Sequence, residues 1–144
     1  ILSANSPFGM FVTLVYVVID TQLKTMSYSS AGHHAILKRD GKSGKVDALE
    51  NLGGPPAGMA EGSRFIQNQI VIVPGDLFFA YTDGVPEARN KNKEEYGNEK
   101  LEAILGEKKS NAADYADFVL ADLKKFTGNT PPHDDITVIS VLIP

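Results

Sequence analysis

The pattern of hydrophobic and polar positions in the first half of the chain predicts β-strands. Four runs are predicted to be strands, namely Gly9–Asp20, Lys24–Gly32, His34–Asp40 and Lys45–Glu50. The first of them is rich in β-branched and aromatic residues, which favour extended backbone. We expect the first two runs to form a hairpin. Asp-Gly within Asp40–Gly44 predicts a turn between the last two.

The strand pattern continues after Asn51–Gly62, a segment rich in glycine and proline that is typical of a surface loop. Arg64–Val73 and Leu77–Asp83 are apolar runs, and Pro74–Asp76 between them has the composition of a tight turn. We therefore expect these two runs to be an antiparallel pair joined by that turn.

The spacing of apolar residues then becomes helical, in Tyr96–Glu107 and more clearly in Asn111–Phe126. Asn111 is placed to cap the start of the second helix, and Gly128 marks its end. The expected apolar face of this helix comprises Tyr115, Phe118, Val119, Leu123 and Phe126. A last apolar run, Ile136–Ile143, predicts a final strand.

The predicted order of elements is strands, two helices and one strand, which favours an α+β fold with an antiparallel sheet and helices on one face. With 144 residues the chain is long enough for one domain with a hydrophobic core. Its longest apolar run, Phe11–Ile19, is far shorter than the roughly 20 residues of a membrane-spanning helix. No membrane segment is therefore expected.

The net charge and the absence of cysteine argue against some classes of function. The formal net charge is -4, whereas a general nucleic-acid-binding surface would be basic, so nucleic acid is not an expected partner. The absence of cysteine excludes disulfides and thiolate zinc sites and fits a cytoplasmic protein. Because Ile1 is not an initiator methionine and a strand follows almost at once, we expect the chain to be part of a longer protein.

The candidate chemistry lies in carboxylates at two strand ends. Asp83 ends one predicted strand, and Asp134 and Asp135 come just before another. If these strands are antiparallel neighbours, the carboxylates meet at one edge of the sheet, where Asp83 and Asp134 would face each other. They would then repel each other unless a cation offsets their charge, and oxygen ligands favour Mg²⁺ or Mn²⁺. Gly84 would let the backbone pass close to such an ion.

Each of these residues also has a simpler interpretation. Asp83-Gly84 is a common turn sequence, and Asp134-Asp135 can be a solvated strand end. No serine has a nearby histidine and aspartate, so a side-chain nucleophile is poorly supported. The coincidence of two acidic segments, each adjoining an apolar strand, favours the metal hypothesis.

Several segments together resemble one family. They are "FVTLVYVVID", "SYSSAGHHAILKRDG", "GGPPAGM", "IVPGDLFFAYTDGVPEARNKNKEEYG" and "HDDITVISV". They are similar to the bacterial PPM-type (PP2C-like) serine/threonine phosphatases, in the branch of the sporulation stage II E phosphatase and the phosphatases that regulate sigma factors. The resemblance covers nearly the whole chain.

The resemblance implies an antiparallel β-sandwich flanked by helices, with two Mn²⁺ or Mg²⁺ ions at its edge. It implies hydrolysis of phosphoserine or phosphothreonine by a metal-activated water. By motif match, Asp83 and Asp134 correspond to metal-ligating, catalytic aspartates. Asp135 and Gly84 are weaker metal candidates.

The resemblance also bears on substrate and partners. Residues 86–97 match the stretch that follows the metal aspartate, so Glu87, Arg89 and Asn90 are candidates for substrate binding, although loop polarity or capping explains each equally well. The implied substrate is a phosphorylated protein, typically an anti-sigma-factor antagonist.

Two acidic motifs of the family, a "GGDYYD"-like and a "D-x-x-GHG"-like segment, are absent. Residues 1–144 therefore resemble the C-terminal part of a single phosphatase domain, incomplete at its N-terminus. We expect this polypeptide alone to be inactive or weakly active, and its incomplete sheet edge to allow dimerisation. The alternative is a phosphatase-like protein-binding module that has lost catalysis.

Overall fold

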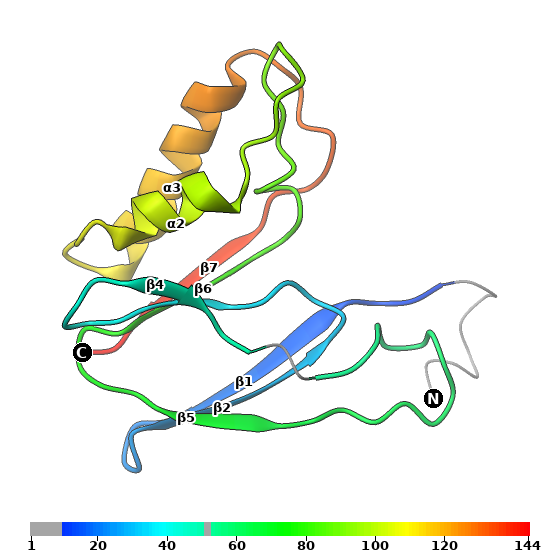
Figure 1. Cartoon of the computed structure of the whole chain (residues 1–144), viewed down its shortest axis with the longest axis vertical. Coiled ribbons are helices and arrows are strands. Elements are labelled where there is room, and N and C mark those ends of the chain that lie inside the picture. The colour runs from blue at the N-terminus through cyan, green and yellow to red at the C-terminus, as the bar shows by residue number, and fades with distance from the viewer. Residues whose placement is uncertain (1–9, 51–52) are drawn as a thin grey trace. The chain divides into compact units, whose positions relative to one another are not determined.

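The computed structural model describes residues 10–50 and 53–144, and within these ranges the chain forms strands and two helices (Figure 1). Gly9, Asn51 and Leu52, which fall in predicted elements, lie outside the described residues. The strands are β1 (Leu14–Asp20), β2 (Thr25–Ala31), β3 (Leu37–Arg39), β4 (Val46–Ala48), β5 (Asn68–Val71), β6 (Leu77–Tyr81) and β7 (Val138–Leu142). The helices are α2 (Asn98–Gly106) and α3 (Ala112–Thr127).

The chain divides into two compact units, which we describe separately. Unit 1 contains residues 1–35 and 50–73, and its described part holds an antiparallel sheet in the order β1-β2-β5. The β1–β2 hairpin was correctly predicted, and Asp20 closes its turn by accepting hydrogen bonds from the backbone N–H groups of Gln22 and Leu23. The central strand β2 buries Met26 and Tyr28.

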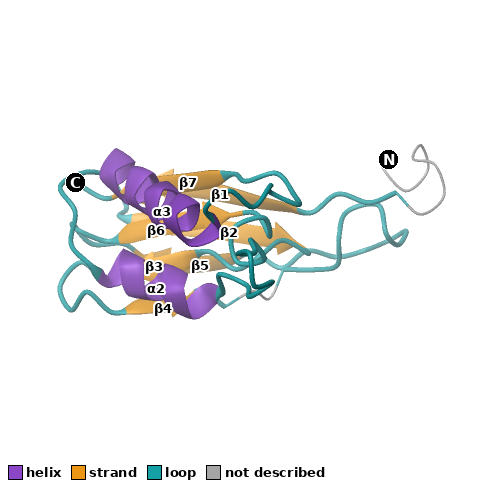
Figure 2. Cartoon of the chain, turned by 90° about the horizontal axis from the view of Figure 1, so that it is seen from above, coloured by secondary structure: helices purple, strands orange, loops and turns teal. Residues whose placement is uncertain are grey.

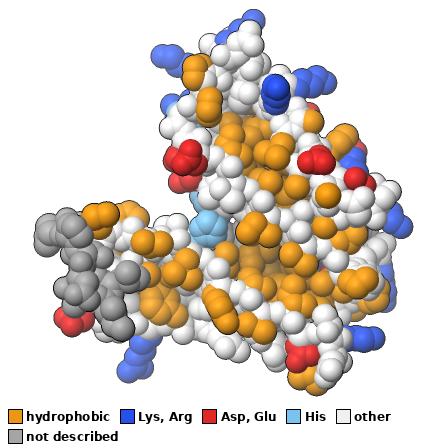
Figure 3. All heavy atoms as spheres, turned by 180° about the vertical axis from the view of Figure 1, so that it is seen from behind, with side chains coloured by type: hydrophobic (Ala, Val, Ile, Leu, Met, Phe, Trp, Pro, Cys, Tyr) orange, Lys and Arg blue, Asp and Glu red, His pale blue; other side chains and the backbone are white. Residues whose placement is uncertain are grey.

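The outer strand of this sheet, β1, is apolar and exposed. Leu14, Tyr16 and Val18 are 41%, 66% and 47% exposed, and exposed hydrophobic side chains are common on the face of the molecule drawn in Figure 3. Edge strands in monomeric proteins usually carry charges or proline that prevent further pairing. Up to Asp20, β1 has neither.

Unit 2 contains residues 36–49 and 74–144 and holds an antiparallel sheet in the order β4-β3-β6-β7. Both helices lie over one face of this sheet, as predicted (Figure 2). That face presents alternate residues of β6, and Leu77, Phe79 and Tyr81 are all at least 95% buried. Burying each such side chain stabilises the fold by roughly 1.5–3 kcal/mol.

The second helix largely follows its sequence prediction. Tyr115, Val119 and Leu123 are buried in the core of unit 2, and the side chain of Asn111 caps the N-terminus by accepting from the N–H of Asp114 at 3.0 Å. Gly128 ends the helix with a φ of 59°.

The prediction that Phe118 belongs to the apolar face of this helix is wrong. The Phe118 side chain is 44% exposed. The ammonium of Lys109 lies 3.4 Å from the centre of its ring. A cation–π contact therefore covers Phe118 in place of core packing.

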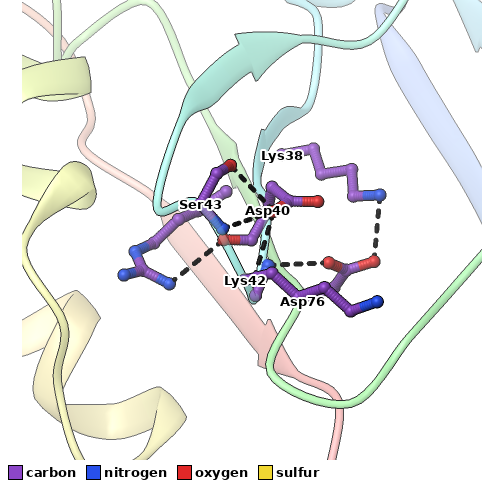
Figure 4. Close-up of polar contacts among 7 residues, drawn as sticks. Lys38, Asp40, Lys42, Ser43 and Asp76 are labelled. Atoms are coloured by element: carbon purple, nitrogen blue, oxygen red, sulfur yellow. Dashed lines mark hydrogen bonds and ion pairs between the residues drawn. The ribbon is translucent and has the colours of Figure 1, made fainter.

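The predicted pairing of Arg64–Val73 with Leu77–Asp83 is also wrong, because β5 pairs with β2 whereas β6 pairs with β3 and β7. Asp76, which is fully buried, ties the start of β6 to other residues of unit 2. Its carboxylate accepts from the N–H of Gly41 and forms an ion pair with Lys38, both at 2.9 Å, next to the turn that contains Asp40 and Ser43 (Figure 4). The backbone of Asp76 bonds to Ile143, so the start of β6 is committed to the sheet of unit 2.

The strands are shorter than the apolar runs that predicted them, since the flanking residues form turns and isolated bridges. Neither helix in the described part of the chain is long and apolar enough to cross a membrane.

Candidate functional site

The predicted pairing of the two acidic strand ends is confirmed. β6 and β7 are antiparallel neighbours, with Tyr81 opposite Val138. Beyond this pair, the N–H of Thr82 donates to the carbonyl of Thr137 at 3.1 Å. The Thr82 hydroxyl donates to the carbonyl of Asp135 and accepts from the N–H of Thr137, each at 3.0 Å. Thr82 therefore holds the approach to β7 against the end of β6.

This register sets the relative positions of the acidic residues. Continuing it by two residues places Asp83 opposite Ile136 and Gly84 opposite Asp135. A Cβ at Gly84 would lie 2.3 Å from the Asp135 carbonyl oxygen, which no real side chain tolerates. Asp83 and Asp134 therefore lie at the same end of the strand pair, but diagonally offset and not directly opposite.

The carboxylates at this edge are accessible. Asp83, Asp134 and Asp135 are all exposed. One oxygen of Asp83 accepts from the N–H of Gly84 at 3.0 Å, and one oxygen of Asp134 accepts from the N–H of Asp135 at 2.7 Å. These bonds orient the two side chains and use only one oxygen of each, so a second oxygen is left for another partner.

The exposed carboxylates fit a hard divalent cation as one part of a coordination shell, because Mg²⁺ and Mn²⁺ prefer oxygen ligands. The glycine at position 84 has a different reason, since the Asp135 carbonyl fills the space that a side chain would need. Among residues 10–50 and 53–144, however, no group of three or more acidic or histidine side chains gathers closely enough to hold a metal. The described carboxylates would supply only part of a site.

The turn after Asp83 carries the candidate substrate residues. The N–H of Glu87 donates to the carbonyl of Asp83 at 3.0 Å, which closes the turn. The Glu87 side chain is exposed and lies 3.7 Å from His133. This contact joins the residues that follow β6 to those that precede Asp134.

Arg89 and Asn90 both have partners in their own loop. The Arg89 guanidinium forms an exposed ion pair with Glu95 at 2.7 Å. The Asn90 amide oxygen accepts from the N–H groups of Asn92 and Glu94, and its amide nitrogen donates to the Glu94 carboxylate. The structure thus gives Asn90 a role in shaping the loop, which was the simpler interpretation of its polarity.

Sequence reasoning missed two residues of this edge. Thr82 precedes the aspartate and looks like an ordinary strand residue, but its hydroxyl bridges two backbone groups of the neighbouring strand. His133 lies directly before Asp134, and its side chain is 3.7 Å from that of Glu87. The signal for Thr82 was its position just after one apolar strand, while Asp135-Ile136-Thr137 comes just before another.

The comparison with protein families now decides the family. The model described as Stage II sporulation protein E (SpoIIE) matches residues 1–144. This chain belongs to the SpoIIE family. Protein IcfG of Synechocystis sp. is 32% identical to it over 143 residues, which make up 98% of this chain and 22% of IcfG.

Solved structures show the fold of the SpoIIE-family chain. The SiaA-PP2C domain of Pseudomonas aeruginosa matches 92% of this chain with a TM-score of 0.76 at 20% identity. The phosphatase domain of SpoIIE from Bacillus subtilis, in a Mn-presoaked form, matches 91% with a TM-score of 0.69 at 20% identity. The expected α+β, PP2C-like fold is therefore confirmed.

The chain spans only part of each relative. It covers 52% of the SiaA chain and 56% of the B. subtilis SpoIIE chain, so about half of each solved structure has no counterpart in these 144 residues. The chain is homologous to PP2C-type phosphatase domains.

Proposed function

We propose that this chain is part of a metal-dependent protein serine/threonine phosphatase that hydrolyses phosphoserine or phosphothreonine. The observation that carries the proposal is the paired end of β6 and β7, where exposed Asp83 and Asp134 lie on neighbouring strands and Gly84 packs against the backbone of Asp135. Membership of the SpoIIE family supports this interpretation of the edge.

Asp83 and Asp134 would each supply a carboxylate oxygen to a Mn²⁺ or Mg²⁺ ion. Asp135 and the backbone of Gly84 are further candidates, and two ions are proposed for a complete domain. Bound divalent ions in such sites lower the pKa of a water ligand and neutralise the charge of a phosphoryl group. The B. subtilis SpoIIE phosphatase domain was studied after soaking with Mn, which supports this choice of metal.

The protein's own residues hold the site in place. Thr82 fixes the two strand ends together, and the backbone N–H groups of Gly84 and Asp135 orient the acidic side chains. Glu87 and Arg89 border the same edge and are proposed to contact the phosphoprotein, with Asn90 shaping their loop. An anti-sigma-factor antagonist is the proposed substrate class, and a cytoplasmic location and dimerisation through an incomplete sheet edge stay predictions.

The first test is calorimetric titration of Mn²⁺ into the wild type and Asp83→Asn. We expect the substitution to weaken binding at least tenfold, because it removes a charged ligand. Asp47→Asn is the matched control, since Asp47 is an exposed aspartate paired only with Lys45. Equal Mn²⁺ affinity in wild type and Asp83→Asn would remove Asp83 from the site.

The second test is hydrolysis of p-nitrophenyl phosphate with Mn²⁺. We expect the 144-residue chain to be inactive or weak, and a polypeptide that adds the missing acidic motifs to be active. Turnover by the 144 residues alone at ordinary enzyme rates, of about 1 s⁻¹ or more, would show that the proposed ligand set is wrong.

One observation favours a second candidate, a phosphatase-like binding module without catalysis. The described residues contain no cluster of three potential metal ligands. If the longer polypeptide bound a phosphoprotein but neither Mn²⁺ nor p-nitrophenyl phosphate, the binding-module function would replace the enzymatic one.

A further inference from the structure

A cleft of about 250 Å³ lies in unit 2 beside the candidate metal edge, between the C-terminal half of α3 and the segments 84–89 and 130–136. Its buried lining includes Ala88 and Leu123, which are 4% and 3% exposed. Leu120 and Ile136 also line it and are 39% and 37% exposed. The cleft is thus apolar at its base and open to solvent.

The size of this cleft suits a side chain better than a whole ligand. Small-molecule sites usually have volumes of about 300–1,000 Å³, whereas an apolar cavity of about 150 Å³ holds a benzene-sized group. A volume of about 250 Å³ has room for one large apolar side chain presented by another protein.

Three basic side chains lie on the rim of the cleft. Arg89, Lys124 and His133 all line it and all are exposed. Arg89 is paired with Glu95, and His133 lies near Glu87, but Lys124 forms no ion pair with any residue in the described ranges. Lys124 therefore presents an ammonium group that no described acidic side chain neutralises, next to an apolar pocket, which favours an occupant with an acidic group.

The cleft also adjoins the proposed reaction edge. Gly84 belongs to both, and His133 on the rim directly precedes Asp134. A polypeptide whose side chain filled the cleft would pass directly beside the residues proposed to hold the metal. A phosphorylated residue a few positions away in the same polypeptide could reach that edge.

We propose that this cleft is a docking subsite for the protein substrate, taking one large apolar side chain with an adjacent acidic residue that pairs with Lys124. The proposal rests on the proposed phosphatase function and deepens it by defining the substrate sequence. It makes the C-terminal half of α3 a determinant of specificity, while the aspartates at the strand ends act on any phosphoryl group.

The probe is a library of synthetic phosphoserine peptides in which each flanking position carries Leu, Ala, Asp or Lys in turn. Binding to the 144-residue protein is measured by fluorescence anisotropy with Mn²⁺ present. We expect a preference for Leu at one position and for Asp beside it. Leu120→Ala should abolish the preference for Leu, and Lys124→Glu should weaken binding of the Asp peptide about tenfold, which corresponds to roughly 1.4 kcal/mol.

Lys125→Glu is the matched control, because Lys125 is exposed, lies in the same last turn of α3 and is not part of this cleft. It should leave both preferences unchanged. The charge-swapped pair gives a stronger test. Lys124→Glu should bind the peptide with Lys at the selected position better than the one with Asp.

Three results would overturn the docking proposal. They are the absence of any positional preference, equal effects of Lys124→Glu and Lys125→Glu, and no charge-swap recovery. The phosphatase function is tested separately with p-nitrophenyl phosphate, which is too small to need the cleft. Peptide selectivity that is independent of phosphorylation, with no hydrolysis in the longer polypeptide, would keep the docking subsite and reject the phosphatase.

Discussion

At the scale of single residues, Thr82 has the most consequential side chain that is not itself a candidate ligand. One hydroxyl satisfies both the Asp135 carbonyl and the Thr137 N–H, 53 and 55 residues away along the chain. Removing it would leave two backbone groups without their partner. The position of Asp134 relative to Asp83 therefore depends on Thr82, which directly precedes Asp83 and bonds to the backbone just after Asp134.

We predict that Thr82→Val will lower the free energy of unfolding by about 0.5–1.5 kcal/mol, because the isosteric methyl group cannot bond to either backbone group and water at this exposed edge replaces part of the loss. It should also weaken Mn²⁺ binding in calorimetry, whereas Thr82→Ser, which keeps the hydroxyl, should retain wild-type affinity. Thr127→Val is the control, since the Thr127 hydroxyl makes only a long, exposed bond of 3.4 Å to Lys124. Wild-type Mn²⁺ affinity in Thr82→Val would deny Thr82 a positioning role.

At the scale of elements, the buried pair of Lys38 and Asp76 connects the β3–β4 hairpin to the start of β6. The turn of that hairpin is fixed by Asp40, whose carboxylate accepts from the backbone and hydroxyl of Ser43. These bonds lower the pKa of Asp40, so they stabilise the turn above the ordinary aspartate pKa and are lost as the pH falls through the lowered value. The two aspartates have different roles, one local and one between elements.

We predict that Asp76→Ala will destabilise the protein by about 3–5 kcal/mol, because it leaves the partly buried Lys38 ammonium without its partner and the Gly41 N–H unbonded. Urea unfolding would measure the change. The comparison is Asp47→Ala, which breaks the exposed Lys45–Asp47 pair and should cost about 1 kcal/mol or less. Equal losses from the two substitutions would mean that Asp76 contributes no more than a surface charge.

The same element scale shows what sequence patterns can and cannot predict. Capping and periodicity predicted α3 because these signals lie within the helix itself, and Asp-Gly predicted the hairpin turn for the same reason. Strand β6 has two neighbours, β3 and β7, and the sequence predicted only its pairing with β7. The pattern at Pro74–Asp76 is the same for a hairpin and for a strand that begins a different sheet, and only the burial of Asp76 separates the two.

For the candidate site, the sequence predicted the location but not the detailed arrangement of the residues. Its location at the β6–β7 edge followed from two acidic segments adjoining apolar strands, and the pairing is confirmed. The diagonal offset of Asp83 and Asp134 depends on the register of the two strands. The sequence does not determine this register, because the apolar runs are longer than the strands that form within them. The roles of Thr82 and Asn90 arise from contacts with backbone groups, which any sequence possesses and no side-chain pattern reveals.

At the scale of the whole molecule, buried tyrosines are expected to lower the free energy of unfolding as the pH becomes alkaline. Burial raises the pKa of Tyr28, Tyr81 and Tyr96, and nearby Glu50, Glu102 and Asp122 raise it further. The Tyr96 hydroxyl also donates to Asp122 at 2.9 Å. A folded-state pKa above the unfolded value contributes stability that is complete below the unfolded pKa, about 10 for tyrosine, and is lost as the pH rises beyond it.

We therefore predict that the free energy of unfolding falls between pH 10 and 11, by about 1.4 kcal/mol per pH unit for each fully linked tyrosine. Urea unfolding at pH 8, 10 and 11 would measure the slope. Tyr96→Phe should give a shallower slope than the wild type. An unchanged slope in this variant would show that Tyr96 is not linked to folding in this range.

The hydroxyl of Thr82 has a consequence for how the protein is made. Its bonds cross more than 50 residues of sequence, so the acidic edge cannot form while the chain is only partly synthesised. Contacts of such long separation form slowly because a large loop must close first. A nascent chain that has emerged only as far as α3 would therefore lack the paired strand ends that carry Asp83 and Asp134, and these ends can pair only after the residues of β7 leave the ribosome.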